Sequence, residues 1–398
     1  KVFKKIEKPG ECKIMAEGLD GLPLFECARM TADIDATEKG AAVIFGKEKD
    51  LPYCGTFDGD KHYLKLNINV SDNPAAFIRY MESGTVKNLI FTGAISITTS
   101  EDESQPAGLI GVVTPQQDVR IENCVSAVTL TNPNGGTINL GGFVGELAII
   151  RPGSSGNLFI SNSCFVGGIM APYGNNIGGL IGNASSSVTL KDCYVSPAFV
   201  RVDASDKKLA VSLVNAVKGA TPIIDNCYYA NLPNFFIKQG IETVTDSIVC
   251  GALCYALNKG VIDGSQAWYQ YLSNPKDSIP YPFSRYSQKD AVTRNKFGKY
   301  ENYCDHKFDA NGFCTLCGAI NPDAKEVTIS SNDNMRRWAE LVNAGYGDVS
   351  VKLAVNVNYE YIGKNVTYTG TFDGQGYKVT VDFEKEANTK PAMWANFA

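Results

Sequence analysis

The sequence predicts an all-β protein built as a parallel β-helix, a solenoid in which successive passes of the chain stack on one another. Two recurring phrases carry this prediction. The first is an aliphatic pair between glycines, at residues 107–111, 141–145 and 178–182, with a degraded copy at 209–214. The second is a β-rich segment that ends in cysteine, and its copies recur about 30–40 positions apart, which is the spacing of a solenoid repeat.

The repeats read as short strands joined by turns. Runs of Val, Ile, Leu and aromatic residues alternate with Gly, Asn, Ser and Pro clusters, and no helical period is visible across residues 84–230. One copy cannot bury its apolar face alone, whereas stacked copies bury a continuous core. A propeller of four-stranded blades is the alternative, but it requires denser hairpin turns. We therefore expect parallel pairing between successive copies over about residues 50–235.

The cysteines of the second phrase are predicted to pack inside the stack. A free cysteine is a small, readily buried apolar residue, and one position repeated in every rung gives a column of like side chains. We expect Cys124, Cys193 and Cys227 in one interior column, with Cys164 near it, and disulfide or metal chemistry are the alternatives. The copy that contains Cys164 has one additional residue, which predicts a local bulge.

A longer repeat divides the chain into modules. The segment Gly55–Gly59 (Gly-Thr-Phe-Asp-Gly) recurs as Gly370–Gly374, and an alternating strand follows each copy. The predicted organisation is an N-terminal flank and module entrance (1–49), β-helix repeats (50–245), a module-closing segment (246–300), a Cys/His knuckle linker (301–322) and the incomplete start of a second module (323–398). Asp58 and Asp373 are predicted to stabilise turns rather than to catalyse, because Asp-Gly is first a turn signal.

A short helix is predicted before the second module, over residues 331–344. Ser331 or Asn332 can cap its N-terminus, and Gly345 can end it. An apolar stripe at 3–4 spacing consists of Met335, Trp338, Leu341 and Val342. Such a helix can cover the end of a solenoid, which would otherwise expose unpaired strand edges.

The second module is predicted to be an incomplete solenoid, because its sequence stops soon after the entrance. Residues 391–394 correspond to residues 74–77, which in the first module precede every rung. Trp394 and Phe397 would then lack a core. We expect a fragment of a longer multi-module protein, with residues 326–398 docked on the first module or poorly ordered; a deliberate final half-module is the alternative.

One cluster has the chemistry of a metal site: Cys304, His306, Cys314 and Cys317. A Cys-x-x-Cys-Gly turn directs two sulfurs to one side, and Cys-x-His can complete the tetrahedral Cys₃His set that Zn²⁺ accepts. With four protein ligands, the zinc would be structural. Disulfides and free thiols are the alternatives.

Charge and hydropathy restrict the partners. The formal net charge is −5 and Lys and Arg form no block, so no nucleic-acid-binding surface is predicted. The sequence has no run of 18 apolar residues, and we predict no membrane span.

The repeated phrases resemble the GLUG-motif repeat family of bacterial secreted and cell-surface proteins. The resemblance lies in the Gly-Thr-Phe-Asp-Gly turns and in the Gly-Leu-Ile-Gly phrases at 108–111 and 179–182. It extends to 142–145 and to the segment 251–258, and covers roughly two-thirds of the chain. It implies a multi-module protein at the cell surface or outside the cell, with β-helical rungs and no agreed activity.

We expect a non-catalytic protein that serves adhesion or acts as a glycan- or protein-binding scaffold, with environmental or host glycans or surface proteins as partners. The alternative is a β-helical polysaccharide-degrading enzyme, a lyase or a hydrolase. Such enzymes need clustered carboxylates or basic groups on one face. In this sequence the rungs carry Ser, Asn and Thr, and the acidic residues are scattered through turns. We therefore predict no catalytic residue, and no cofactor other than the structural zinc.

Overall fold

The computed structural model describes residues 3–8, 11, 25–72, 74–98, 106–133, 139–148, 153–172, 176–202, 210–211, 213–216, 220–230, 242–244, 251–272, 279–285, 291–295, 299–358, 360–363 and 366–381. It is mostly β-structure and divides into two compact units, Lys1–Ala291 and Val292–Ala398. Trp394 and Phe397, the two aromatic residues that were predicted to lack a core, lie outside the described residues.

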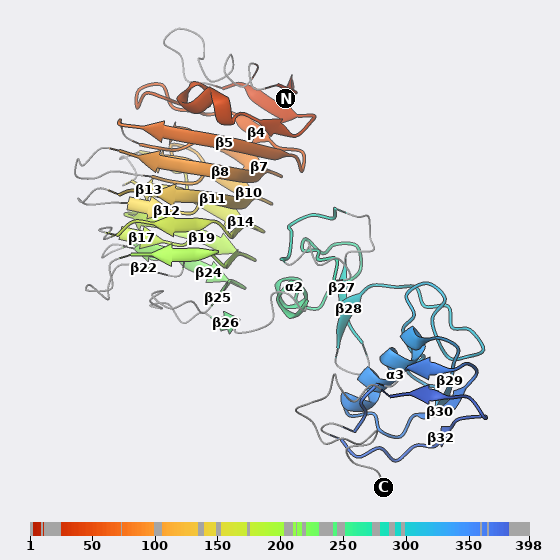
Figure 1. Cartoon of the computed structure of the whole chain (residues 1–398). Helices are drawn as coiled ribbons and strands as arrows, with labels where there is room; N and C mark the ends of the chain where they lie inside the picture. The colour runs from red at the N-terminus through yellow and green to blue at the C-terminus, as the bar shows by residue number, and fades with distance from the viewer. Residues whose placement is uncertain are drawn as a thin grey trace. The chain divides into compact units, whose positions relative to one another are not determined.

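Parallel sheets make up the first unit (Figure 1). Along the chain, each sheet receives one strand after another in sequence order, so neighbouring strands of a sheet come from successive passes of the chain. Every strand pair of this unit that the structure describes is parallel, which confirms the pairing predicted from the repeats.

Sheet 1 contains eight strands, and sheet 2 contains ten. The strands of sheet 1 are β1 (Phe3–Ile6), β2 (Cys27–Met30), β4 (Thr56–Asp58), β7 (Gly84–Lys87), β10 (Val119–Glu122), β14 (Leu158–Ser161), β19 (Val188–Lys191) and β24 (Ile223–Asp225). Those of sheet 2 are β3 (Ile34–Asp35), β5 (Tyr63–Val70), β8 (Ile90–Ile97), β11 (Val125–Thr131), β15 (Cys164–Phe165), β16 (Gly168–Met170), β20 (Tyr194–Val195), β21 (Phe199–Arg201), β25 (Tyr228–Ala230) and β26 (Glu242–Val244). A 3₁₀ segment, η1 (Thr37–Val43), follows β3.

Sheets 3 and 4 are shorter, with five and three strands. Sheet 3 consists of β6 (Ile78–Met81), β9 (Ile110–Val113), β13 (Val144–Leu147), β18 (Ile181–Ala184) and β23 (Val214–Ala216). Sheet 4 consists of β12 (Asn139–Gly141), β17 (Asn176–Gly178) and β22 (Ala210–Val211). The stack therefore begins at β1, well before residue 50: residues 1–49 contribute strands to sheets 1 and 2 and do not merely flank them.

The aliphatic-glycine phrases start the strands of sheet 3. Ile110, Val144 and Ile181 pair in register and are fully buried. Glycine is needed beside them because the backbones approach closely. A Cβ on Gly142 would lie 2.2 Å from the carbonyl oxygen of Gly179, which no other residue tolerates. The glycines of this phrase therefore act through close approach rather than through a positive φ.

A single residue in the left-handed conformation joins sheet 1 to sheet 2 in the passes from β7–β8 to β24–β25. It is Asn or Asp in every described copy, with φ between 44° and 54°: Asn88, Asn123, Asn162, Asp192 and Asn226. These residues tolerate this conformation better than others. Their side chains also form a ladder, in which Asn123 Nδ2 donates to Asn88 Oδ1 at 3.1 Å and Asn226 Nδ2 donates to Asp192 Oδ1 at 2.6 Å.

This ladder gives a stability prediction. Replacing Asn123 with Ala is expected to lower the free energy of unfolding by about 2–3 kcal/mol, because left-handed strain costs about 1–2 kcal/mol and the lost hydrogen bond about 1 kcal/mol. Asn123→Gly is the matched control. Glycine loses the side-chain hydrogen bond but adopts the left-handed conformation without strain, so this variant should lose only about 1 kcal/mol of unfolding free energy. Urea unfolding of both variants measures the difference, and equal losses would contradict the conformational argument.

The predicted cysteine column is confirmed. Cys124, Cys193 and Cys227 each follow the left-handed residue and are buried, and none is in a disulfide. Burial raises the pKa of the Cys124 thiol to about 12, so it is unreactive near neutral pH. Packing is thus the role of this column.

The predicted bulge at Cys164 is wrong. Cys164 pairs with Val125, one position beyond the column, and Ile160 keeps its register with Ile121. No residue is inserted, because Ser163 takes the column position and its Oγ accepts a hydrogen bond from the Cys124 amide at 3.1 Å.

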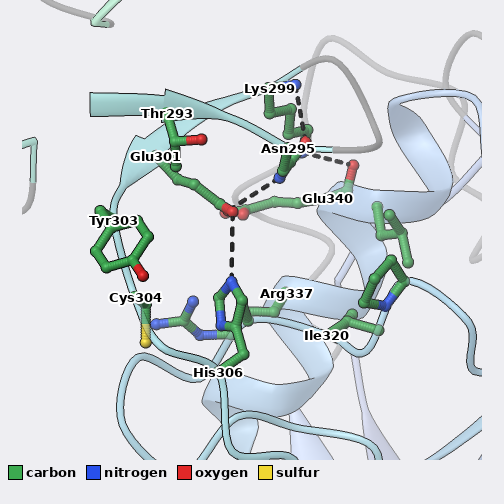
Figure 2. Close-up of a pocket in the computed structure, with 13 residues that line it drawn as sticks. Thr293, Asn295, Lys299, Glu301, Tyr303, Cys304, His306, Ile320, Arg337 and Glu340 are labelled. Carbon is green, nitrogen blue, oxygen red and sulfur yellow. Dashed lines mark hydrogen bonds and ion pairs between the residues drawn. The ribbon is translucent and has the colours of Figure 1, made fainter. Parts of the chain in front are cut away.

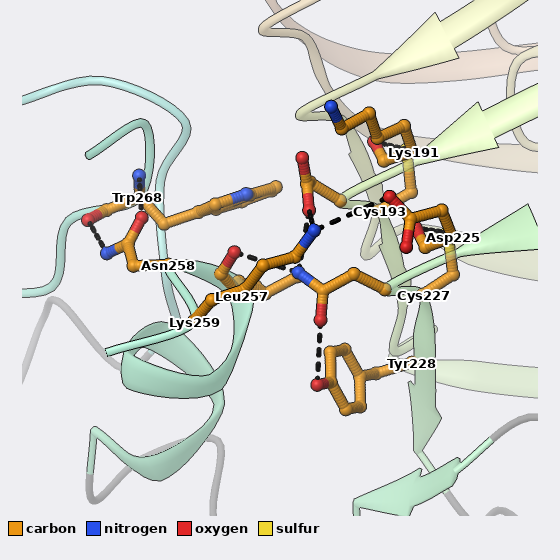
Figure 3. Close-up of polar contacts among 11 residues, drawn as sticks. Lys191, Cys193, Asp225, Cys227, Tyr228, Leu257, Asn258, Lys259 and Trp268 are labelled. Atoms are coloured by element: carbon orange, nitrogen blue, oxygen red, sulfur yellow. Dashed lines mark hydrogen bonds and ion pairs between the residues drawn. The ribbon is translucent and has the colours of Figure 1, made fainter. Parts of the chain in front are cut away.

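Residues 251–272 and 279–285 pack against the last passes of the first unit. The segment includes α2 (Ala252–Leu257), and its buried Trp268 ring lies 5.3 Å from the Tyr194 ring. Figure 3 shows the polar contacts beside it: Asn226 Nδ2 donates to the Leu257 carbonyl at 2.9 Å, and Lys259 Nζ lies 3.4 Å from an Asp225 carboxylate oxygen. This segment therefore covers Tyr194 of β20 and the turn residue Asn226.

The second unit starts with an antiparallel pair, β27 (Val292–Arg294) and β28 (Tyr300–Asn302). The division between the units at residues 291 and 292 thus falls inside the 246–300 segment that the sequence presented as one closing element. The other elements are β29 (Glu326–Ile329), α3 (Asn332–Asn343), β30 (Ser350–Leu353), β31 (Val357–Asn358), β32 (Phe372–Asp373) and β33 (Val379–Thr380).

Helix α3 confirms the predicted helix and its boundaries. The Ser331 hydroxyl accepts from the Asn334 amide, as an N-cap does, and Gly345 has a φ of 115° just after the helix. The predicted stripe is buried, and Trp338 Nε1 donates to the Val349 carbonyl at 3.0 Å. The stripe forms the core of the second unit with strands β29 and β30.

The second unit repeats the entrance of the first. Strands β29, β30 and β32 pair in parallel like β1, β2 and β4, and β31 pairs with β33 like β3 with β5. In both copies a buried tyrosine two residues before the Gly-Thr-Phe-Asp-Gly turn reaches back to the residue before the second strand. Tyr53 donates to the Glu26 carbonyl at 3.0 Å, and Tyr368 lies 3.5 Å from the Val349 carbonyl.

The turns of the two entrances also match. Asp58 Oδ1 accepts from the Asp60 amide at 3.0 Å, and Asp373 Oδ1 accepts from the Gln375 amide at 3.0 Å, so both aspartates stabilise their turns as predicted. Asp58 is buried and also accepts from Asn88 Nδ2 at 3.0 Å, which places it at the start of the asparagine ladder. Among the described residues, no helix is long and apolar enough to span a membrane.

Candidate metal centre

The structure brings together all four predicted ligands. The ligating atoms of Cys304, His306, Cys314 and Cys317 lie within 4.8 Å of one another. Cys304 Sγ is 3.8 Å from Cys314 Sγ, and Cys317 Sγ is 3.4 Å from His306 Nδ1. The three cysteines are free, so the disulfide alternative has no support in this arrangement.

These distances fit a tetrahedral ion. With Zn–S bonds of about 2.3 Å, a tetrahedron separates two sulfurs by roughly 3.8 Å. With a Zn–N bond of about 2.0–2.1 Å, it separates a sulfur from a nitrogen by roughly 3.5 Å. Both separations agree with the two measured pairs. Two of the six ligand–ligand separations therefore already match a bound ion, and the four ligand atoms together, all within 4.8 Å of one another, are close enough to form a metal site.

Local sequence explains how each half presents its ligands. In the Cys314–Cys317 turn, the Gly318 amide donates to the Cys314 carbonyl at 2.8 Å and Gly318 has a φ of 73°, which favours glycine. The Leu316 amide points at Cys314 Sγ, at 3.4 Å. Cys304 and His306 are separated by one residue, and in an extended segment residues i and i+2 point to the same side. One intervening residue is therefore a suitable spacing.

The thiols of the cluster have different pKa values: that of Cys314 is lowered and that of Cys304 is raised. Burial opposes ionisation of Cys314, but a hydrogen bond from His306 and the amides of Cys317 and Leu316 prevail and lower its pKa to about 6. Burial and the neighbouring thiols raise the pKa of Cys304 to about 12. The cluster thus presents one ready thiolate at neutral pH, and a bound cation would favour ionisation of the others.

A turn between the two halves folds the chain back. Asp309 Oδ1 accepts from the amides of Asn311 and Phe313 at 2.9 and 3.0 Å, and Gly312 has a φ of 85°. We call residues 304–318 the knuckle. Phe313, at its centre, is buried in the core of the second unit together with Val327.

The knuckle is therefore part of the second unit. The sequence presented residues 301–322 as a linker between modules, but the Thr328 amide of β29 donates to the Asn311 carbonyl at 3.0 Å, and Ile320 also lies in the second core. The buried side chains of Phe313, before the Cys314–Cys317 turn, and Ile320, after it, hold the four ligands at the start of the module that contains β29 and α3.

A cavity of about 370 Å³ adjoins the cluster, lined in part by Cys304 and His306. Figure 2 shows Glu301 reaching from β28 toward the imidazole, and Glu301 Oε1 lies 3.7 Å from His306 Nε2. Asn295 Nδ2 donates to the other carboxylate oxygen at 2.9 Å. Sequence reasoning did not find Glu301, because only the pairing of β27 with β28 and the fold of the knuckle bring it to His306.

Ion pairs between acidic and basic side chains lie beside the asparagine ladder of the first unit. Arg29 and Lys87 lie 3.3 and 3.6 Å from Asp58 Oδ2, and Lys259 lies 3.7 Å from Asp192. Hydrogen bonds from Asn88 and an amide, and the two cations, outweigh burial and lower the pKa of Asp58, which favours the ionised form. These groups belong to the ladder and its neighbours.

The fold is similar to that of a "putative immunoglobulin A1 protease" from Bacteroides ovatus, with 15% sequence identity and a TM-score of 0.41 over 70% of this chain and 91% of that one. No family model matches the sequence, and no curated protein matches it.

Proposed function

We propose that the chain is a non-catalytic binding scaffold built from β-helical modules, in which the parallel sheets of the first unit wind as a parallel β-helix. The observation that carries this proposal is the repetition of the module entrance. The second unit reproduces the strand pairing, the buried tyrosine and the aspartate turn of the first. The features that are repeated between the modules are those that build the framework, and they do not form one reaction centre.

The Cys₃His cluster supports a structural zinc ion within this framework. Four protein ligands fill a tetrahedral set and leave no position for water, which is typical of structural sites. The knuckle around them is anchored in the core of the second unit. We infer that zinc holds the start of the second module, and elemental analysis of the purified chain should find one zinc per chain.

Surface display is the setting that we propose. The resemblance to the GLUG-motif family supports a location at the cell surface or outside the cell. Adhesion, with glycans or surface proteins as partners, is consistent with side chains such as Asn67, Asn69 and Thr129 that occupy outward positions of sheet 2. These groups can hydrogen-bond sugars or peptides but provide no acid–base pair.

The test is a screen of the complete 398-residue chain against immobilised polysaccharides and surface proteins, followed by incubation of each ligand with the chain. We expect saturable binding with no new reducing ends and no cleaved protein. Turnover that persists after rigorous purification would overturn the proposal in favour of the polysaccharide-degrading alternative or of a protease.

A further inference from the structure

We infer that Glu301 is a positioning residue for the metal centre, whose carboxylate orients the His306 ring so that Nδ1 is the ligating nitrogen. This inference rests on the proposed zinc site and adds a residue to it. It assigns different tasks to the two ring nitrogens of one of the two histidines in the chain.

The geometry separates these tasks. His306 Nδ1 faces the sulfurs and lies 3.4 Å from Cys317 Sγ, while Nε2 faces away from them and lies 3.7 Å from Glu301 Oε1. A neutral imidazole carries one N–H and one lone pair. A carboxylate at Nε2 retains the proton there and leaves the lone pair on Nδ1, where the ion would bind.

The ring and the carboxylate are both held in place. The His306 ring stacks on Phe308, with centroids 5.3 Å apart and planes 19° apart. Asn295 Nδ2 donates to Glu301 Oε2 at 2.9 Å, and Asn295 Oδ1 accepts from the Lys299 amide at 3.0 Å. The contact therefore connects the β27–β28 hairpin to the knuckle through His306, as the side chains in Figure 2 show.

The same cavity contains a matched control. Glu340 also lines it, but the Glu340 carboxylate pairs with Arg336 on the exposed side of α3. Its removal takes away one carboxylate from the cavity without touching His306. A general effect of negative charge on zinc binding can thus be separated from the orientation of the ring.

The experiment measures the zinc dissociation constant of the whole chain by competition with a chelating dye. Glu301→Ala is expected to weaken binding about 10–100-fold, which is the usual cost of removing such an outer partner. Glu301→Gln retains only one acceptor oxygen, so its NH₂ group must face either Asn295 Nδ2 or His306 Nε2, and it should recover at most part of the affinity. Glu340→Ala should stay within about twofold of the unmodified chain.

The outcomes separate the inference from the proposed site. If the unmodified chain binds no zinc, the metal proposal itself fails. If it binds zinc and Glu301→Ala binds equally well, only the positioning role is overturned. A loss in Glu340→Ala as large as that in Glu301→Ala would also overturn it, because negative charge in the cavity, rather than orientation of the ring, would then support binding. Circular dichroism at saturating zinc checks that each variant is folded.

Discussion

Zinc removal is expected to unfold the second unit and to leave the first unit folded. Phe313 of the knuckle and Ile320 just after it lie in the core that contains Trp338, and the four ligands would hold the two halves of the knuckle together. A metal that binds only the folded state stabilises it by about 4 kcal/mol when its concentration is 1,000 times the dissociation constant. A small unit of about 100 residues is marginally stable without such a contribution.

Hydrogen exchange with mass spectrometry locates this effect on the intact chain. Amides of α3 and β29 should lose most of their protection when a strong chelator is added, and they should recover it when zinc is restored. Amides of β5 and β8 in the first unit should not change. Undiminished protection of α3 after verified loss of zinc would exclude a structural role for the ion.

A cysteine variant provides the genetic counterpart. Cys317→Ser removes one ligand and should reproduce the effect of the chelator at limiting zinc. Cys27→Ser is the control, because Cys27 is a half-buried free thiol in β2 of the first unit and is remote in sequence from the knuckle. It should retain one zinc per chain and full protection of α3.

Phe77→Ala is expected to cost the first unit about 3–5 kcal/mol of unfolding free energy. The Phe77 ring is fully buried and lies at the centre of an aromatic cluster, 5.1 Å from the Phe45 ring, 5.3 Å from the Phe57 ring and 5.7 Å from the Phe91 ring. Truncation leaves a cavity among side chains that belong to different passes of the chain, so they cannot collapse without moving the strands.

The matched control is Phe159→Ala in the same stack. Phe159 is half-buried on the outward side of β14, with the Arg120 guanidinium 4.3 Å from its ring centroid. Loss of this exposed cation–π contact should cost about 1 kcal/mol or less. Urea unfolding monitored by exchange of the β5 and β8 amides compares the two variants. A loss for Phe159→Ala as large as that for Phe77→Ala would show that the buried cluster has no special role.

Local signals in the sequence predicted several elements correctly. Helix α3 begins and ends as predicted because Ser331, the apolar stripe and Gly345 all lie within one short segment. The Asp58 and Asp373 turns were predictable for the same reason, since an aspartate accepts from an amide two residues ahead. Contacts between neighbours in sequence need no knowledge of the fold.

A signal in the same phrases was overlooked. The residue before each column position is Asn or Asp, and this fact was available from the sequence. It indicates a left-handed residue that turns the chain from sheet 1 to sheet 2. With that alignment, Ser163 rather than Cys164 falls in the column, and the predicted bulge disappears.

The all-β class, the parallel pairing of successive copies and the four residues of the candidate metal centre could be predicted from the sequence, because repeated apolar positions and Cys/His spacings are visible along the chain. The tertiary structure was needed to show that the knuckle belongs to the second unit, that Asp58 is buried in the ladder and that Glu301 faces His306. Each of these three features depends on a contact between two segments that no repeated pattern in the sequence connects. Such contacts arise from how strands pack, so they appear only when the chain is folded.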